Sequence, residues 1–183
     1  KGAEAVSKYV GLAEQEAFNI EYWLLEEAKL QRMPKPKTLS GKVAYVTGGT
    51  GGIGKAIAEV LLQNGAVAIV ADRDRLEETE TELKKKYGKD AAIAVAIDVT
   101  KPEAIADSLQ QSILAFGGVD IVVNCAGLSI SKPLEDHEIK DWDILQDVLV
   151  KGQFLVSQQA VAIMRAQGLD GDIVNIASKN GLF

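Results

Sequence analysis

The chain of 183 residues is long enough to bury one core and carry an appendage, and its 47% hydrophobic and 25% charged residues are typical of a globular protein. A net charge of −6 argues against a nucleic-acid partner, and the lack of a long apolar stretch argues against a membrane partner and a signal peptide. The single cysteine, Cys125, excludes an intrachain disulfide and favours a reducing compartment, so we expect a cytoplasmic protein.

Residues 1–40 differ from the rest and are expected to form an N-terminal helix and a linker. The helix is predicted over Leu12–Arg32, with acidic residues early, basic residues late and a broad apolar belt. Pro34 and Pro36 end it and predict a stiff, extended linker. An apolar helix needs a partner surface, so we expect it to pack on its own domain or on a neighbouring subunit. A separate binding function is the alternative.

From Gly41 onward, short apolar runs alternate with helical segments. The runs predict strands at Lys42–Val46, Val67–Ala71, Ala91–Ile97, Asp120–Asn124 and Asp172–Ile176. Helices are predicted at Gly52–Gln63, Arg73–Tyr87, Thr100–Phe116, which opens with a capping box from Thr100 to Glu103, and Trp142–Gln167. Strands separated by such helices pair in parallel with right-handed crossovers. Residues 41–183 are therefore expected to form an α/β domain with a doubly wound parallel sheet of the Rossmann type, incomplete at its C-terminus.

The first predicted strand runs directly into a glycine-rich loop, Thr47-Gly-Gly-Thr-Gly-Gly-Ile-Gly54, and a helix follows at once. Gly48 permits the tight turn, Gly52 lets a diphosphate approach the backbone, and Gly54 allows close packing of helix and strand. The free N–H groups and the positive end of the helix favour an anionic diphosphate. The loop lacks the Gly-Lys-Ser/Thr ending of a P-loop. The predicted cofactor-binding residues of this loop are Gly48, Thr50, Gly51, Gly52, Ile53 and Gly54.

Asp72 follows the second predicted strand, about 20 residues after the glycine-rich turn, where an acidic residue meets the ribose diol of a dinucleotide. Its carboxylate can accept hydrogen bonds from both hydroxyls and would repel a 2′-phosphate, so NAD is favoured over NADP. Arg73 beside it could stack on adenine or, in another geometry, hold a 2′-phosphate. Asp72 could also cap the helix expected from Arg73, a role that is compatible with ribose binding.

The spacing Thr-Gly-x-x-x-Gly-Ile-Gly resembles the fingerprint of the short-chain dehydrogenase/reductase family. The resemblance implies that Asp98 and Val99, at the end of the third predicted strand, contact adenine; alternatively, the Asp98 side chain caps the next helix or satisfies a turn. Asn124-Cys-Ala-Gly127 is similar to the family's Asn-Asn-Ala-Gly. By this resemblance Asn124 ties adjacent strands, and Ala126 and Gly127 leave room for the cofactor.

Neither the cysteine nor the histidine of the chain indicates a reactive group. Cys125 has no basic partner close in sequence and is expected to be a small buried residue rather than a nucleophile. His137, the only histidine, lies in an acidic loop and is expected at the surface. No histidine-based triad and no metal site are therefore predicted.

The stretch Asp172-Ile-Val-Asn-Ile-Ala-Ser178 resembles the family's fifth strand, which implies that Ser178 hydrogen-bonds the substrate oxygen. In the family a tyrosine follows that serine, with a lysine four residues further on that lowers its pKa. Neither can be assigned, since none of the four tyrosines, Tyr9, Tyr22, Tyr45 and Tyr87, has a lysine at that spacing. Leu149 stands where the family usually carries a proton-relay asparagine.

The N-terminal segment and the Gly171–Asn180 stretch together resemble the dehydrogenase part of bifunctional rhamnulose-phosphate aldolase/alcohol dehydrogenases. This implies an NAD-dependent oxidoreductase acting on a lactaldehyde-like hydroxy-aldehyde or alcohol, fused to an aldolase domain and forming a homo-oligomer through its long helix. The missing tyrosine and lysine are then expected after Phe183. The alternative is a non-catalytic dinucleotide-binding or interaction module that keeps the fold and has lost the Tyr-x-x-x-Lys chemistry.

Overall fold

The computed structural model describes residues 15–16, 24–33 and 35–178, and the chain divides into two units, Lys1–Lys37 and Thr38–Phe183. In the first unit the helix α3 spans Leu24–Arg32, the last part of the helix expected there. The remainder of that expected helix lies outside the described residues, except for residues 15–16, which are helical.

The second unit is built on a parallel sheet, as the sequence predicts. Its strands are β1 (Val43–Thr47), β2 (Val67–Asp72), β3 (Ala92–Ala96), β4 (Ile121–Asn124) and β5 (Asp172–Asn175). Their order is β3-β2-β1-β4-β5, with every neighbouring pair parallel. From β1 the chain winds outward to β2 and β3 on one side, then crosses back to β4 and β5 on the other. The boundary between β1 and β4 is therefore the point where the winding direction switches.

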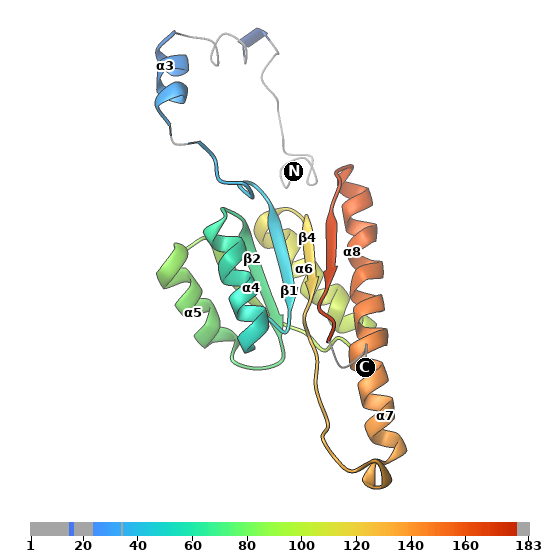
Figure 1. Ribbon diagram of the computed structural model, residues 1–183. Helices are drawn as coiled ribbons and strands as arrows, with labels where there is room; N and C mark the ends of the chain where they lie inside the picture. Colours follow the sequence, from blue (N-terminus) through green and yellow to red (C-terminus); the bar gives the residue numbers. More distant parts are fainter. Residues whose placement is uncertain (1–14, 17–23, 34, 179–183) are drawn as a thin grey trace. The chain divides into compact units, whose positions relative to one another are not determined.

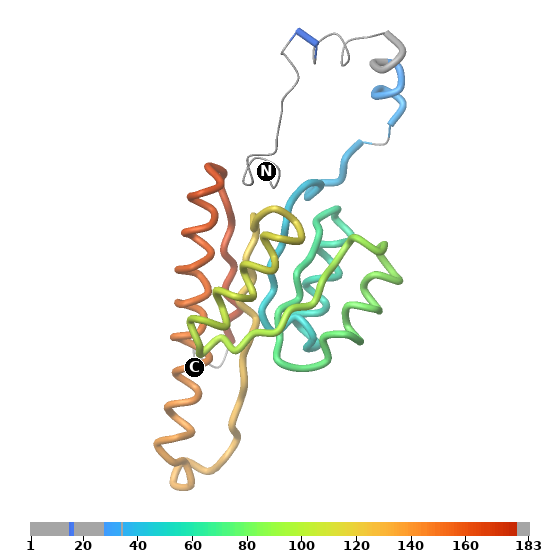
Figure 2. Tube along the Cα trace, turned by 180° about the vertical axis from the view of Figure 1, so that it is seen from behind, coloured from blue at the N-terminus to red at the C-terminus, as the bar shows by residue number. Residues whose placement is uncertain are grey.

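Helices cover both faces of the sheet (Figures 1 and 2). On one face α4 (Gly52–Gln63) and α5 (Leu76–Tyr87) enclose a core that includes Val46, Val70 and Leu83. On the other face α6 (Pro102–Phe116) and α8 (Gln153–Gln167) enclose a core that includes Tyr45 and Ile105. Successive strand residues point to opposite faces, so the apolar runs in the strands supply both cores.

The long helix differs from its prediction in two ways. It begins earlier, as α7 (Ile139–Gln146), and a π-helical turn at Asp147–Gly152 joins α7 to α8. A capping box forms at the start of α7, between Glu138 and Asp141. π-helical turns are often found at functional sites, and this one carries Val148 and Leu149 past the ends of the strands.

Two other predicted helix starts were also wrong. The helix α5 begins at Leu76 instead of Arg73, because Arg75 before it has a left-handed backbone with φ of 55°. The capping box expected at Thr100 does not form: Lys101 is the N-cap residue of α6 and makes no side-chain cap bond. The Thr100 hydroxyl instead donates to Asp98 Oδ1 at 2.7 Å.

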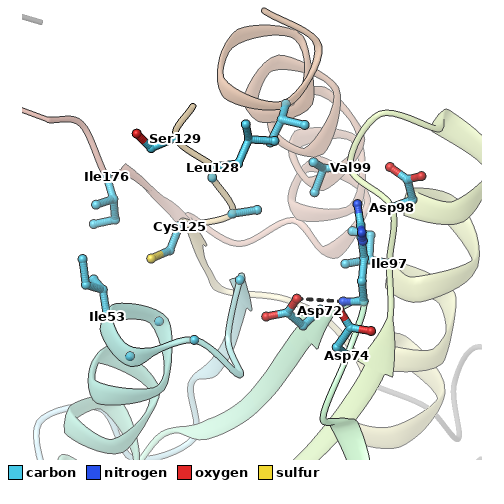
Figure 3. A pocket seen from close by; sticks show the side chains of 18 residues that line it. Ile53, Asp72, Asp74, Ile97, Asp98, Val99, Cys125, Leu128, Ser129 and Ile176 are labelled. Atoms are coloured by element: carbon cyan, nitrogen blue, oxygen red, sulfur yellow. Dashed lines mark hydrogen bonds between the residues drawn. The ribbon is translucent and has the colours of Figure 1, made fainter. Parts of the chain in front are cut away.

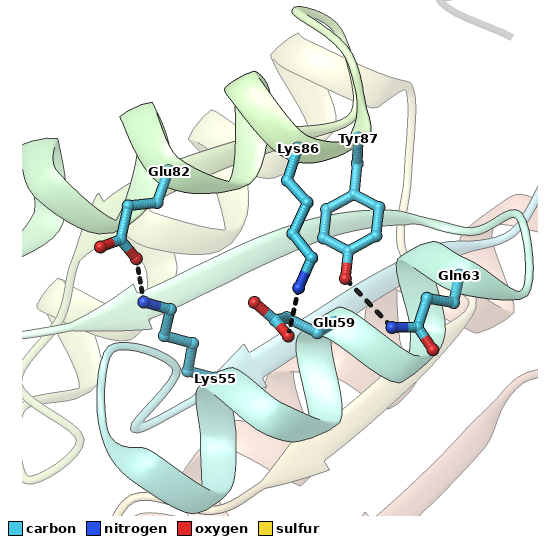
Figure 4. A network of polar contacts seen from close by, with 6 residues as sticks. All are labelled: Lys55, Glu59, Gln63, Glu82, Lys86 and Tyr87. Atoms are coloured by element: carbon cyan, nitrogen blue, oxygen red, sulfur yellow. Dashed lines mark hydrogen bonds and ion pairs between the residues drawn. The ribbon is translucent and has the colours of Figure 1, made fainter.

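The exposed sides of α4 and α5 are joined by polar contacts (Figure 4). Lys55 pairs with Glu82, Lys86 donates to Glu59 at 3.0 Å, and Gln63 donates to the Tyr87 hydroxyl at 3.2 Å. Water screens the charges of exposed pairs such as these, so we expect them to add little to the stability of the fold. Among the described helices, none is both long and apolar enough to cross a membrane.

Candidate functional site

A cavity of about 800 Å³ lies at the carboxyl ends of the strands, where the winding direction switches (Figure 3). This is the place where open α/β sheets bind ligands, and the size suits a cofactor. Its lining combines the glycine-rich loop and the start of α4 with residues at or just after the ends of β2, β3, β4 and β5, and with one residue of the π-helical turn: Gly48, Gly51, Gly52, Ile53, Gly54, Asp72, Arg73, Asp74, Ile97, Asp98, Val99, Cys125, Ala126, Gly127, Leu128, Ser129, Ile176 and Val148.

The glycines of the loop meet different constraints. Gly48 has a φ of +66°, and a Cβ on it would lie 2.9 Å from the Ala126 backbone. A Cβ on Gly54 would overlap the carbonyl oxygen of Gly48, so the loop and the first turn of α4 pack together only with glycine there. A Cβ on Gly52 would meet no atom within 4 Å. Gly52 therefore faces open space at the start of the helix, which is where a diphosphate needs room.

The N-terminus of α4 is a positive site. The N-cap residue, Gly51, has an extended backbone and no side-chain cap bond. The first-turn N–H groups of an α-helix have no partner within the helix, and the helix dipole adds positive potential there. With no acidic residue in the first turn of α4, this end of the cavity favours an anion.

Asp72, the last residue of β2, is held by hydrogen bonds to the glycine-rich loop and to its own neighbour in sequence. Its Oδ2 accepts hydrogen bonds from the Thr50 N–H at 3.1 Å and from the Thr50 hydroxyl at 2.7 Å. Its Oδ1 accepts from the Arg73 N–H at 2.7 Å. Since α5 begins at Leu76, Asp72 does not cap that helix, and this alternative is wrong. Asp72 and Arg73 both line the cavity, whereas Thr50 is buried behind them.

Asp98 and Val99 line the cavity beyond the end of β3. Asp98 Oδ1 accepts from the N–H and the hydroxyl of Thr100, at 3.0 and 2.7 Å, so the side chain satisfies a turn. The hydrogen bond from the Thr100 side chain, and to a smaller extent the one from the Thr100 backbone, hold the pKa of Asp98 below its usual value. Val99 packs against Gly152 of the π-helical turn, where a Cβ would lie 2.9 Å from Val99 Cγ2.

Side chains at the ends of β1 and β4 bind these two strands together below the cavity. The Thr47 Oγ1 accepts hydrogen bonds from the N–H groups of Cys125 and Ala126, both at 3.1 Å. Asn124 is buried, and its Nδ2 donates to Ser157 of α8 at 2.9 Å and to Asn175 of β5 at 2.8 Å. Asn124 therefore links three elements and lies beneath the cavity rather than in its wall.

Of Cys125, Leu149 and Ser178, only Cys125 lines the cavity. Cys125 is half-buried, and burial, followed by the charge of Asp72, raises the pKa of its thiol, so a reactive thiolate is disfavoured. Leu149 lies against Gly127, where a Cβ would be 3.2 Å from Leu149 Cδ2. Ser178 is exposed, three positions beyond the end of β5, and is not among the lining residues.

Several lining residues were missed from the sequence: Asp74, Ile97, Cys125, Leu128, Ser129, Val148 and Ile176. Most of them adjoin a predicted strand end, a signal that could have found them, because the ends of parallel strands meet at one edge of the sheet. Val148 is different, since only the π-helical turn brings it to the cavity. In the described part of the chain, no group of three or more His, Cys, Asp or Glu side chains could hold a metal ion.

Residues 42–183 match the family model described as short chain dehydrogenase. The chain belongs to this family. It is 40% identical over its whole length to the oxidoreductase YuxG of Bacillus subtilis, and 37% identical over 78% of its length to the oxidoreductase SAR2567 of Staphylococcus aureus. The chain spans 27% of the first relative and 61% of the second.

Solved structures of short-chain dehydrogenases resemble the second unit. A short-chain type dehydrogenase/reductase from Mycobacterium marinum has a TM-score of 0.75 and 35% identity, over 79% of this chain and 59% of that one. A short-chain dehydrogenase from Novosphingobium aromaticivorans has a TM-score of 0.74 and 27% identity, over 79% and 55%. Residues 1–30 match a different model, the second domain of class II aldolases. Short-chain dehydrogenases generally bind nicotinamide dinucleotides, and the cavity described above suits one.

Proposed function

We propose that the chain is the cofactor-binding part of an NAD-dependent short-chain oxidoreductase. The observation that carries this proposal is the arrangement of the cavity, with an uncapped helix N-terminus and open space at Gly52 on one side and the Asp72 carboxylate on the other. A positive site next to a fixed carboxylate suits a diphosphate joined to a ribose with a free 2′-hydroxyl.

Different residues of the cavity are proposed to contact different parts of the cofactor. The N–H groups at the start of α4 hold the diphosphate, and Asp72 accepts from the adenosine ribose. Asp98 and Val99 line the part of the cavity beyond β3 and would contact the adenine. Ala126 and Gly127 leave backbone space for the nicotinamide half. Bound NAD supplies the hydride acceptor, or NADH the donor.

The proposed substrate is a small hydroxy-aldehyde or alcohol of the lactaldehyde type. Support comes from the N-terminal match to a class II aldolase domain, because an aldolase that cleaves a phosphorylated ketose releases a small aldehyde. Ser178 would hydrogen-bond the substrate oxygen. The proton-transfer group is proposed to come from sequence outside these 183 residues, since no tyrosine here has a lysine four positions later.

A homo-oligomer is also proposed, formed through the long helix. Ile139 and Trp142 of α7, Val150 of the π-helical turn and Phe154 of α8 expose large apolar side chains. Large apolar side chains exposed along one helix favour an interaction with another protein surface. Light scattering coupled to size-exclusion chromatography should give a mass of at least two chains, and Phe154→Glu should lower it; a monomeric wild-type protein would contradict this part of the proposal.

The function is tested by following NADH oxidation at 340 nm with lactaldehyde, using the full-length protein. We expect turnover with NADH, slower turnover with NADPH, and a roughly 10²-fold lower kcat in Ser178→Ala, the loss typical of removing one donor to the reacting oxygen. Ser131→Ala, in the loop before α7, is the matched control. A protein that binds NADH and turns over no small aldehyde or alcohol would instead be the non-catalytic binding module.

A further inference from the structure

Thr50 occupies an unusual position in the glycine-rich loop, because both of its donors point at one carboxylate oxygen. Its N–H and its hydroxyl lie 3.1 and 2.7 Å from Asp72 Oδ2. The residue is only 4% exposed and does not line the cavity, so a bound ligand would meet Asp72 and not Thr50. The two residues are 22 positions apart, and the bonds tie the loop after β1 to the end of β2.

The hydrogen bonds of Asp72 limit how it can meet a ribose. A carboxylate has about four lone-pair positions, and Thr50 and the Arg73 N–H occupy three of them. About one position therefore remains for a ribose hydroxyl, on the Oδ1 side that the Arg73 N–H also contacts (Figure 3). Three bonds from two directions also hold the carboxylate in one orientation.

A fixed orientation matters because a cation stands next to the carboxylate. Arg73 lines the same cavity, and an arginine there can hold a 2′-phosphate in a suitable geometry. The carboxylate opposes that phosphate only while its charge faces the ribose position. Without the Thr50 bonds, Asp72 is free to rotate toward the Arg73 guanidinium, which would weaken both its bond to the ribose and its repulsion of a 2′-phosphate.

We propose that Thr50 is the positioning residue for Asp72, and that its hydroxyl sets the preference for a dinucleotide with a free 2′-hydroxyl over a 2′-phosphorylated one. This inference rests on the proposed function, since it assumes that the cavity binds a nicotinamide dinucleotide. It assigns to Thr50 no contact with the cofactor: the residue acts through the carboxylate that it orients.

The test is a fluorescence titration of the full-length protein with NADH and with NADPH. Thr50→Val keeps the shape and the backbone N–H but removes the hydroxyl, whereas Thr50→Ser keeps the hydroxyl. Ser112→Ala is the matched control, because it removes a buried hydroxyl from α6, away from the cavity. Circular dichroism melting of each variant confirms that it is folded. The same Thr50→Val change is also made in an Asp72→Ala background.

We expect Thr50→Val to bind NADH roughly tenfold more weakly and to lose most of the NADH-over-NADPH preference, the size of one charge-assisted hydrogen bond. Thr50→Ser and Ser112→Ala should keep the wild-type preference, and Thr50→Val should have no further effect once Asp72 is Ala. An unchanged preference in Thr50→Val, or an equal loss with and without Asp72, would overturn the inference. A wild-type protein that binds neither nucleotide would overturn the proposed function itself, and the inference with it.

Discussion

The packing of the fold does not require glycine at position 52, whereas we expect the cofactor to need the space beside it. Replacing Gly52 by alanine is therefore the most informative perturbation of the site. A Cβ at this position meets nothing within 4 Å, and the residue stands in the first turn of α4. Alanine is favoured over glycine in helices by up to about 1 kcal/mol, so Gly52→Ala should be at least as stable as the wild type. The added methyl group nevertheless occupies the space where the diphosphate is expected.

The cost to binding follows from the bonds that the methyl group displaces. Loss of two charge-assisted hydrogen bonds at roughly 1.5 kcal/mol each gives about 3 kcal/mol, or a roughly hundredfold weaker Kd for NADH. Fluorescence titration measures the affinity and thermal melting measures the stability. Gly54→Ala is the matched comparison: its Cβ would overlap Gly48, so it should lower the free energy of unfolding by about 1–3 kcal/mol. A Gly52→Ala protein that binds NADH with wild-type affinity would refute this assignment of the diphosphate.

Three further predictions concern side chains around the cavity. Thr47→Val should lower the free energy of unfolding by about 2 kcal/mol in urea denaturation, because the N–H groups of Cys125 and Ala126 lose their acceptor, while Thr47→Ser should not; equal stability of the two variants would contradict this. Cys125 should react with iodoacetamide more slowly than a free thiol at neutral pH and speed up only in alkali, since burial and Asp72 raise its pKa; rapid labelling at pH 7 would show the opposite. The pKa of Asp98 is lowered in the fold, so its stabilisation is present above its unfolded pKa of about 3.9 and is lost as the pH falls through the folded value. Asp98→Asn should therefore flatten the acid limb of a stability-against-pH curve, and an unchanged limb would count against the Thr100 hydrogen bonds.

Features that depend on neighbouring residues could be predicted from the sequence. The alternation of apolar runs with helices predicted the parallel sheet, and the bounds of α4 agree at both ends, because a glycine-rich loop precedes the helix and Asn64-Gly65 ends it. The start of α5 was missed because Arg75 adopts a left-handed backbone that non-glycine residues rarely take. Nothing local to Arg75 signals this conformation.

Features that depend on distant residues could not be predicted. The bond between Thr50 and Asp72 joins residues far apart in sequence, and each residue alone suggests other roles. The π-helical turn at Asp147–Gly152 likewise packs on residues distant in sequence, with Gly152 against Val99 and Leu149 against Gly127. Most of the predicted residues therefore lie in segments that line the cavity, whereas the contribution of the π-helical turn was not predicted. The sequence alone also does not show which side chains face the cavity and which support it from behind.

A crystal structure of the full-length protein with bound NADH tests the central claim most directly. We expect the diphosphate against the first-turn N–H groups of Gly52, Ile53 and Gly54, and one adenosine ribose hydroxyl within hydrogen-bond distance of Asp72 Oδ1, with Thr50 still bonded to Oδ2. A dinucleotide bound elsewhere, or bound in this cavity with its ribose away from Asp72, would contradict it.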